Sequence, residues 1–235
     1  MTRTMVILGV GSGLGRSVAW QFGREGYQLA LVARRQEPLA QLAEELAADG
    51  IVAEPFAADV ADLAGLPDLF ARITARFGAI DVLYNGVIPP GGFVPATDLT
   101  VDTLRDQIEV VTYPVIAAIR LVLPDMVARG EGAILWANGA SALHADPGMS
   151  GPGPALAATR NYLQTLHAEF APKGVYVGEL LVAAMIEGSL PFETMAEAGL
   201  DLTALPVVRP DDLAALLSQL NRERSSFEIV HPAWG

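Results

Sequence analysis

The sequence predicts an α/β protein, a single domain over residues 1–235 built on a doubly wound parallel sheet of seven strands. Short apolar runs alternate with helical patterns along the chain, and a glycine-rich turn follows the first run. The composition is 51% hydrophobic, enough for a large core. Strands and helices that alternate at this spacing form βαβ units, with helices over both faces of a parallel sheet.

The expected elements follow from apolar periodicity and from glycine stops. Strands are expected at residues 5–8, 27–33, 51–57, 80–84, 132–137, 174–182 and 227–231. Helices are expected from residue 16 to 22 and at 39–49, 63–77, 100–129, 155–171 and 211–221, with a looser segment from 183 to 206.

The helix expected at 100–129 is apolar nearly all round between Val110 and Val127. Such a helix is buried on more than one side, either as a central core helix or at a subunit interface. Pro114 should bend it, because the proline ring displaces a helix hydrogen bond.

The first strand runs directly into a turn rich in glycine, LGVGSGLGR. Glycine lets a backbone turn sharply and lets a phosphate approach it closely. The helix that follows presents unpaired N–H groups and the positive end of its dipole to an anion. The same pattern also occurs in purely structural turns. The residues expected to hold phosphates are Gly9, Gly11, Ser12, Gly13, Leu14 and Gly15.

Composition excludes several classes of function. A net charge of −12 argues against nucleic acid and anionic membranes as partners. The chain has no cysteine and only three well-separated histidines, so neither thiolate chemistry nor a metal site is expected. Glycines interrupt the N-terminal apolar run, which is too short for a signal peptide, and we expect a cytoplasmic protein.

The end of the second expected strand bears on the choice of nucleotide. In dinucleotide folds an acidic residue at this place binds the ribose hydroxyls. Here Ala33 removes that carboxylate, and Arg34 and Arg35 could attract a 2′-phosphate. The alternative is a solvated arginine pair at a helix start. The pattern favours NADP(H), with NAD(H) still open.

Polar residues also follow the third and fourth expected strands. Asp59 and Val60 come after the third, where an aspartate can hold an adenine amino group or cap a helix. Asn85 and Gly86 follow the fourth. Ligands bind open α/β sheets at the carboxyl ends of the strands, where these residues converge with the glycine turn.

With these pieces together, the chain resembles the short-chain dehydrogenase/reductase family over essentially its whole length. The motifs that carry the resemblance are LGVGSGLGR, the dipeptide DV at Asp59-Val60, IDVLYNG, LPDM, GAIL and LHAEFAPKGV. The resemblance implies a Rossmann subunit, a homodimer or homotetramer, and an oxidoreductase with a Tyr/Lys/Ser/Asn set. In that set a lysine lowers the pKa of a tyrosine four residues earlier, so that the phenol can pass a proton.

The sequence departs from the family at each of these four catalytic positions. The only lysine, Lys173, follows the helix in which the family lysine lies, and no Tyr-x-x-x-Lys motif exists. Ser141 and His144 are the nearby candidates for substitute roles, and Arg160 could anchor an anion or lie in solvent or at an interface. The residues at the family's asparagine, serine, tyrosine and lysine positions are Val111, Gly139, Pro152 and Leu156.

Three functions fit this pattern. The first is an NADP(H)-binding protein without the usual proton-transfer site, in a binding, regulatory or pseudoenzyme role. The second is an atypical NADP-dependent oxidoreductase that acts on a small carbonyl or alcohol with substitute residues. The third is a dehydration or isomerisation on the same fold.

Overall fold

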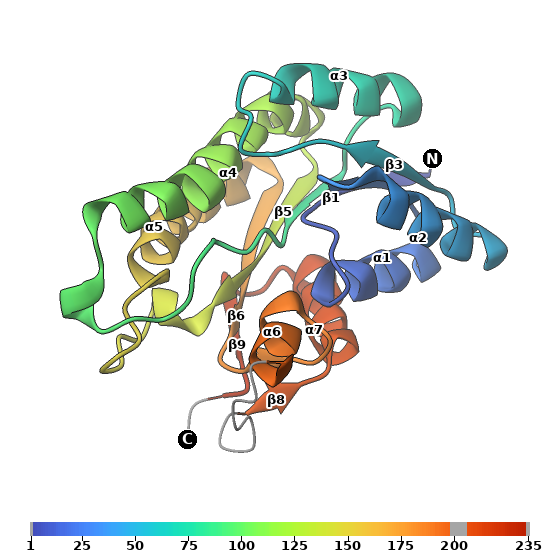
Figure 1. The fold of residues 1–235 in the computed structure, drawn as a ribbon. Helices are drawn as coiled ribbons and strands as arrows, with labels where there is room; N and C mark the ends of the chain where they lie inside the picture. Colours follow the sequence, from blue (N-terminus) through green and yellow to red (C-terminus); the bar gives the residue numbers. More distant parts are fainter. Residues whose placement is uncertain (1, 198–205, 234–235) are drawn as a thin grey trace.

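A seven-stranded sheet, parallel throughout, lies at the centre of the computed structural model, which describes residues 2–197 and 206–233 (Figure 1). The strand order is β3-β2-β1-β4-β5-β6-β9. This confirms the predicted fold class. The strands are β1 (Arg3–Leu8), β2 (Tyr27–Ala33), β3 (Ala53–Ala57), β4 (Val82–Asn85), β5 (Gly132–Gly139), β6 (Val175–Val182) and β9 (Glu228–His231).

Helices cover both faces of the sheet, so the central strands bury side chains on both sides. In β1, Val6 and Leu8 pack under one group of helices, whereas Met5 and Ile7 pack under the other. The first group is α3 (Leu66–Phe77), α4 (Val101–Arg129) and α5 (Gly153–Phe170), and the second is α1 (Leu14–Arg24), α2 (Gln36–Ala48) and α7 (Pro210–Glu223).

Several predicted boundaries move inward, for example at the start of β4, which is Val82 rather than residue 80. Strand β3 begins at Ala53 rather than at residue 51, and α3 begins at Leu66 rather than at residue 63. The residues before α3 form tight turns, in which the Gly65 amide donates to the Asp62 carbonyl at 3.1 Å. Pro67 is the second residue of this helix, where its fixed φ suits the first turn and its missing N–H costs nothing.

The segment after β6 is more ordered than the sequence predicts. It contains β7 (Met185–Ile186), α6 (Leu190–Glu197) and β8 (Val207–Val208), with β7 and β8 paired in parallel. Residues 198–205 of the predicted loose segment lie outside the described residues. The strands β7 and β8 cannot be predicted from apolar periodicity, because two residues are too few to show a period.

The long helix α4 spans 29 residues and continues through both Pro114 and Pro124. Its length and apolar composition alone would also fit a membrane span. It packs against α5, α3 and the sheet, and 44% of its most apolar window is buried in the molecule. Of the two alternatives for this helix, the structure shows the core packing, while one face stays exposed at Tyr113 and Leu121.

Candidate functional site

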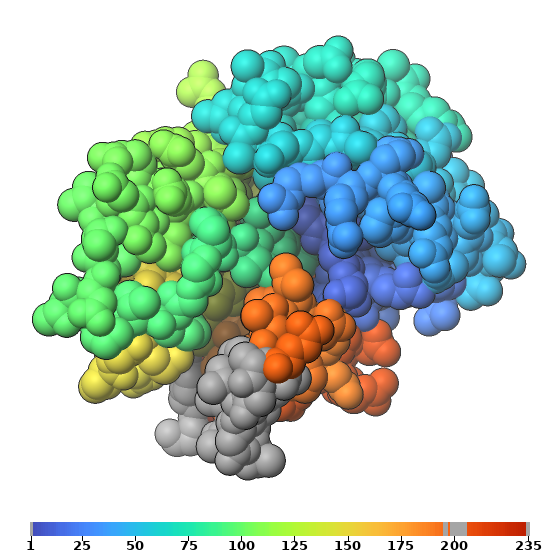
Figure 2. Space-filling model, viewed as in Figure 1, coloured from blue at the N-terminus to red at the C-terminus, as the bar shows by residue number. Residues whose placement is uncertain are grey.

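The glycine turn lies where the strand order reverses. The chain leaves β1 toward β2 on one side and returns to β4 on the other, so the turn after β1 opens between diverging connections. Gly9 and Val10 donate from their amides to the Val32 carbonyl at 3.0 and 3.1 Å, and Gly86 donates to the Leu8 carbonyl at 2.9 Å. The surface recedes at this edge, between the blue, green and orange regions of Figure 2.

Two glycines of the turn are required by close packing. Gly9 has φ +85°, and a Cβ there would lie 2.8 Å from the Val87 nitrogen. A Cβ on Gly15 would lie 2.7 Å from the Gly9 carbonyl oxygen. Both distances are far below van der Waals contact, so side chains at these positions would force the turn apart.

The middle of the turn has room for a ligand. Nothing lies within 4 Å of a Cβ built on the exposed Gly11. Gly13 precedes α1 and makes no side-chain cap, so the positive end of the helix dipole is not neutralised by a capping side chain. On the far side, the Ser12 hydroxyl donates to the Gly188 carbonyl at 2.9 Å and ties the turn to the segment after β6.

Arg34 and Arg35 follow β2 and are exposed beside this turn. Arg35 occupies the N-cap position of α2 without a side-chain capping bond. Asp59 follows β3, where its carboxylate accepts a hydrogen bond from the Ala61 amide at 3.0 Å. It therefore stabilises a local turn and is not the N-cap of α3, which is Gly65. Val60, next to it, is buried.

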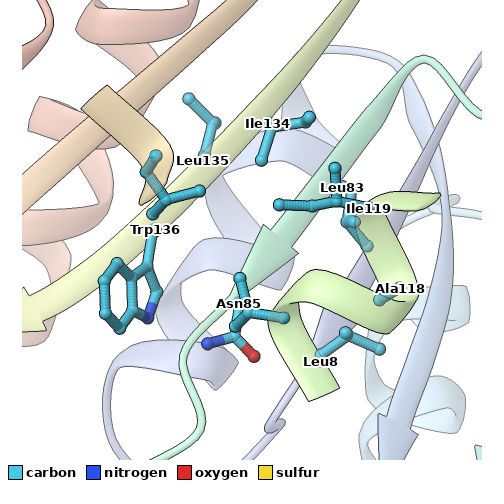
Figure 3. Close-up of a pocket in the computed structure, with 10 residues that line it drawn as sticks. Leu8, Leu83, Asn85, Ala118, Ile119, Ile134, Leu135 and Trp136 are labelled. Carbon is cyan, nitrogen blue, oxygen red and sulfur yellow. The ribbon is translucent and has the colours of Figure 1, made fainter. Parts of the chain in front are cut away.

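Asn85 ends β4, but its side chain turns into the protein interior. It is 6% exposed, and its Nδ2 has no partner among the described residues. Asn85 and Trp136 both line a small cavity with a volume of about 10 Å³ (Figure 3). The indole Nε1 is also buried without a described partner. The side chain of Asn85 is therefore turned away from this edge of the sheet.

The four positions that the sequence comparison assigns to the family's catalytic side chains lie close to the core. Val111 is fully buried, and Leu156 is 5% exposed within the same apolar cluster. A Cβ on Gly139 would lie 3.3 Å from Leu156 Cδ1, so the leucine fills space beside that glycine. Pro152 is buried as the N-cap residue of α5.

The loop between β5 and α5 packs on the loop after β4. The Ser150 amide donates to the Val94 carbonyl at 3.0 Å. Gly151 has φ +45°, and a Cβ there would lie 2.3 Å from the Gly92 carbonyl oxygen. Ser141 is half-buried in a 3-10 turn, and His144 is exposed on the same loop.

A buried charged cluster beneath this loop was missed by the sequence reasoning. Glu179 of β6 is fully buried; its Oε1 accepts from Asn138 Nδ2 at 2.7 Å, and its Oε2 lies 3.3 Å from Arg160 Nε. Arg160 also pairs with Glu228 of β9. Its guanidinium is thus committed within the fold and is neither solvated nor placed to anchor a ligand anion. The available signal was a carboxylate in an otherwise apolar strand, which needs a buried partner.

Burial raises the pKa of the Glu179 carboxyl from 4.5 to about 7. The hydrogen bond from Asn138 and the charge of Arg160 lower this pKa, and the nearby Glu228 raises it. The Asn138 Oδ1 in turn accepts from the Gly139 amide at 2.8 Å. The cluster therefore connects to the start of the β5–α5 loop.

A doubly wound parallel sheet with a glycine turn at its switch point defines the Rossmann class of α/β proteins. Residues 3–186 match the family model described as short chain dehydrogenase. The chain belongs to the short-chain dehydrogenase family.

Relatives and solved structures agree with this assignment. The chain is 29% identical over 228 residues to a dehydrogenase/reductase SDR family protein 7-like of Drosophila melanogaster, covering 92% of this chain and 69% of that protein. It is 30% identical over 185 residues to very-long-chain 3-oxoacyl-CoA reductase of Bos taurus, covering 75% and 57%. The chain thus spans little more than half of the latter relative.

Among solved structures, gluconate 5-dehydrogenase from Burkholderia cenocepacia, in complex with NADP and tartrate, superposes with a TM-score of 0.84 at 22% identity. The superposition covers 97% of this chain and 92% of that one. This likeness shows that the two proteins share a fold.

Proposed function

We propose that this protein binds NADP(H) at the carboxyl edge of its sheet and lacks the tyrosine–lysine proton transfer of its family. The observation that carries the binding proposal is the open space before Gly11 at the uncapped start of α1. A dinucleotide's diphosphate fits such a place, because backbone N–H groups and the helix dipole favour negative charge.

The preference for NADP(H) rests on the end of β2. Arg34 and Arg35 are exposed there, and Ala33 offers no carboxylate to a ribose. A guanidinium can bind a 2′-phosphate through two parallel charge-assisted hydrogen bonds. Several family members of similar fold were solved with NADP or a derivative of it, which supports the same choice.

The absence of conventional proton transfer is supported by what replaces the family residues. Leu156 and Val111 add apolar contacts to the core instead of an ammonium group and a carboxamide. Pro152 has no hydroxyl, and a proton cannot pass through it. The nicotinamide ring carries a transferable hydride when the cofactor is bound. The side chains at these four positions hold no proton to accompany that hydride, so the proposed role is binding, regulatory or that of a pseudoenzyme.

A fluorescence titration of NADPH and NADH tests the proposal. We expect NADPH to bind more tightly than NADH, and Arg34→Ala to weaken NADPH by roughly tenfold or more, since a hydrogen bond to a charged group contributes about 1.5–3 kcal/mol. NADH binding should change little. Arg24→Ala is the matched control, because Arg24 lies at the far end of α1 and pairs with Asp49. Failure of both nucleotides to bind below millimolar concentration would overturn the proposal.

The second candidate is an atypical oxidoreductase, and the names of the relatives favour it, since they include dehydrogenases and reductases. Ser141 and His144 lie on the β5–α5 loop and are its candidate proton donors. Oxidation of NADPH by a panel of small carbonyl compounds, abolished by His144→Ala, would establish this reading. If no carbonyl compound is turned over at saturating NADPH, the oxidoreductase candidate fails and the binding role is the remaining proposal.

We also infer a homodimer or homotetramer that uses the outer face of α4. Between α3 and α4 lies a groove of about 380 Å³, lined by Leu66, Tyr113 and Leu121 among others. Apolar faces of this kind mark interaction sites. Light scattering after size exclusion should give a mass of at least twice 24.8 kDa, and Leu121→Arg should lower it.

A further inference from the structure

The positive charges of this chain are distributed unevenly around the cleft. No arginine or lysine occurs in residues 77–104, 130–159 or 174–208. These stretches contain the three segments that follow β4, β5 and β6, which are neighbours in the sheet. Arg16, Arg34 and Arg35 all lie on the opposite side, around the glycine turn and β2. One half of the edge therefore carries the cations and the other half has none.

The three segments without cations lie around the recess beside the glycine turn. The segment after β5 contacts the segment after β4 through the Ser150–Val94 hydrogen bond. The segment after β6 contacts the glycine turn, where a Cβ on Gly13 would lie 3.2 Å from the Ser189 Cα. The receding surface in Figure 2 is bordered by the green segment, the orange helix α6 and the blue turn. The space next to the proposed diphosphate site is thus bordered by segments without positive charge.

These same segments expose large apolar side chains. Leaving such side chains in water costs free energy that burial against an apolar ligand recovers, at about 25 cal/mol per Å². Each of the following is at least 40% exposed: Ile88, Phe93, Leu143, Met149 and Leu190.

These segments carry carboxylates and no lysine or arginine, and the nearby Arg160 is paired. Asp146, Glu187 and Glu193 are carried by the segments themselves. Arg160, on α5, is 15% exposed and paired with Glu179 and Glu228. An anionic ligand would lose hydration here without a guanidinium or ammonium to replace it, which is costly.

We propose that this half of the cleft binds an uncharged, largely apolar small molecule and discriminates against carboxylates, sulfonates and phosphates. The inference rests on the proposed function in that this molecule would lie beside the nicotinamide end of the bound NADP(H). Its charge selection, however, comes from the three segments alone and can be measured without nucleotide.

Two fluorescent probes with the same ring system test the selection. N-phenyl-1-naphthylamine is uncharged, and 8-anilino-1-naphthalenesulfonate differs from it by one sulfonate. Both brighten on entering an apolar site. We expect the uncharged probe to bind the intact protein at least tenfold more tightly than the sulfonate. Equal affinities, or tighter binding of the sulfonate, would overturn the inference.

Variants locate the binding. Phe93→Ser and Leu190→Ser should each weaken the uncharged probe at least threefold, and Leu143→Arg should strengthen the sulfonate relative to it. Val52→Ser is the matched control, since Val52 is 49% exposed just before β3, outside the three segments. Leu121→Ser reports on the α3–α4 groove. Loss of probe binding in the Leu121 variant, with no change in the Phe93 and Leu190 variants, would assign the probe to the groove and refute the inference.

A parallel NADPH titration separates this inference from the proposed function. If the charge selection and its variants behave as expected while NADPH does not bind, the apolar site stands and the nucleotide proposal fails. If NADPH binds while the probes show no selection, the nucleotide proposal stands and this inference fails.

Discussion

Replacing Glu179 with glutamine should change how the stability of the protein depends on pH. In the folded protein the pKa of this carboxyl is raised from 4.5 to about 7. Between these values the folded state holds a proton that the unfolded state has released, so the stability contributed by Glu179 is full below pH 4.5 and is lost as pH rises through 7. A rise of that size corresponds to about 3 kcal/mol of unfolding free energy, of which about 2–3 kcal/mol is lost between pH 5 and 8.

Urea unfolding of the wild type and of Glu179→Gln at pH 5 and pH 8 measures this effect. The glutamine cannot ionise but keeps an oxygen that can accept from Asn138. The unfolding free energy of the variant, relative to the wild type, should therefore be about 2–3 kcal/mol higher at pH 8 than at pH 5. Glu131→Gln, at an exposed position, is the control and should follow the wild type. The same pH dependence of the unfolding free energy in Glu179→Gln and in the wild type would refute this assignment. So would a variant whose stability relative to the wild type falls between pH 5 and pH 8.

Three further substitutions test the packing described above. Arg160→Ala removes the cation beside the fully buried Glu179 and should lower the unfolding free energy by about 3 kcal/mol at pH 8 and by less at pH 5. Urea unfolding measures this loss. Adding Glu179→Gln to the Arg160→Ala variant should restore part of it. Gly151→Ala should destabilise the fold by about 2 kcal/mol or more, because its Cβ would clash with the Gly92 carbonyl. Gly148 in the same loop has φ +79° but open space around it, so Gly148→Ala should cost about 1 kcal/mol. Equal shifts in the melting temperature of the two variants would contradict the clash. Leu156→Ala should cost about 2–5 kcal/mol by leaving a cavity in the core, and a change under 1 kcal/mol in urea would show that the side chain is not packed as described.

The parallel sheet was predictable because its signals are long and repeated. Strand β6 spans eight residues, of which only Gly178 and Glu179 interrupt the apolar run, and α4 spans 29 residues. The start of α3 was not predictable from apolar spacing, because Leu63 continues the period although the backbone there is in a turn. The small β7–β8 pair depends on contacts between residues more than 20 positions apart, which no local pattern encodes.

The candidate site was predictable where backbone geometry decides it and unpredictable where side chains choose partners across the sheet. The glycines of the turn were predictable because the backbone packing at Gly9 and Gly15 leaves no room for a Cβ. Asn85 could not be placed by spacing, since a residue at the end of a strand can turn either outward or into the core. The pairing of Arg160 was not predictable for the same reason, because its partners Glu179 and Glu228 lie on two strands, β6 and β9, distant in the sequence.

Leu156 occupies space that a side chain at position 139 would need, and this limits which substitutions the protein tolerates. A serine at 139 would crowd the leucine, a lysine at 156 would place an ammonium among core side chains, and a tyrosine at 152 would have to fit at a buried helix start. Each single step toward the family's catalytic set is penalised before the others are in place. Under the proposed function, gaining the family's catalytic set at these positions would therefore require coordinated changes.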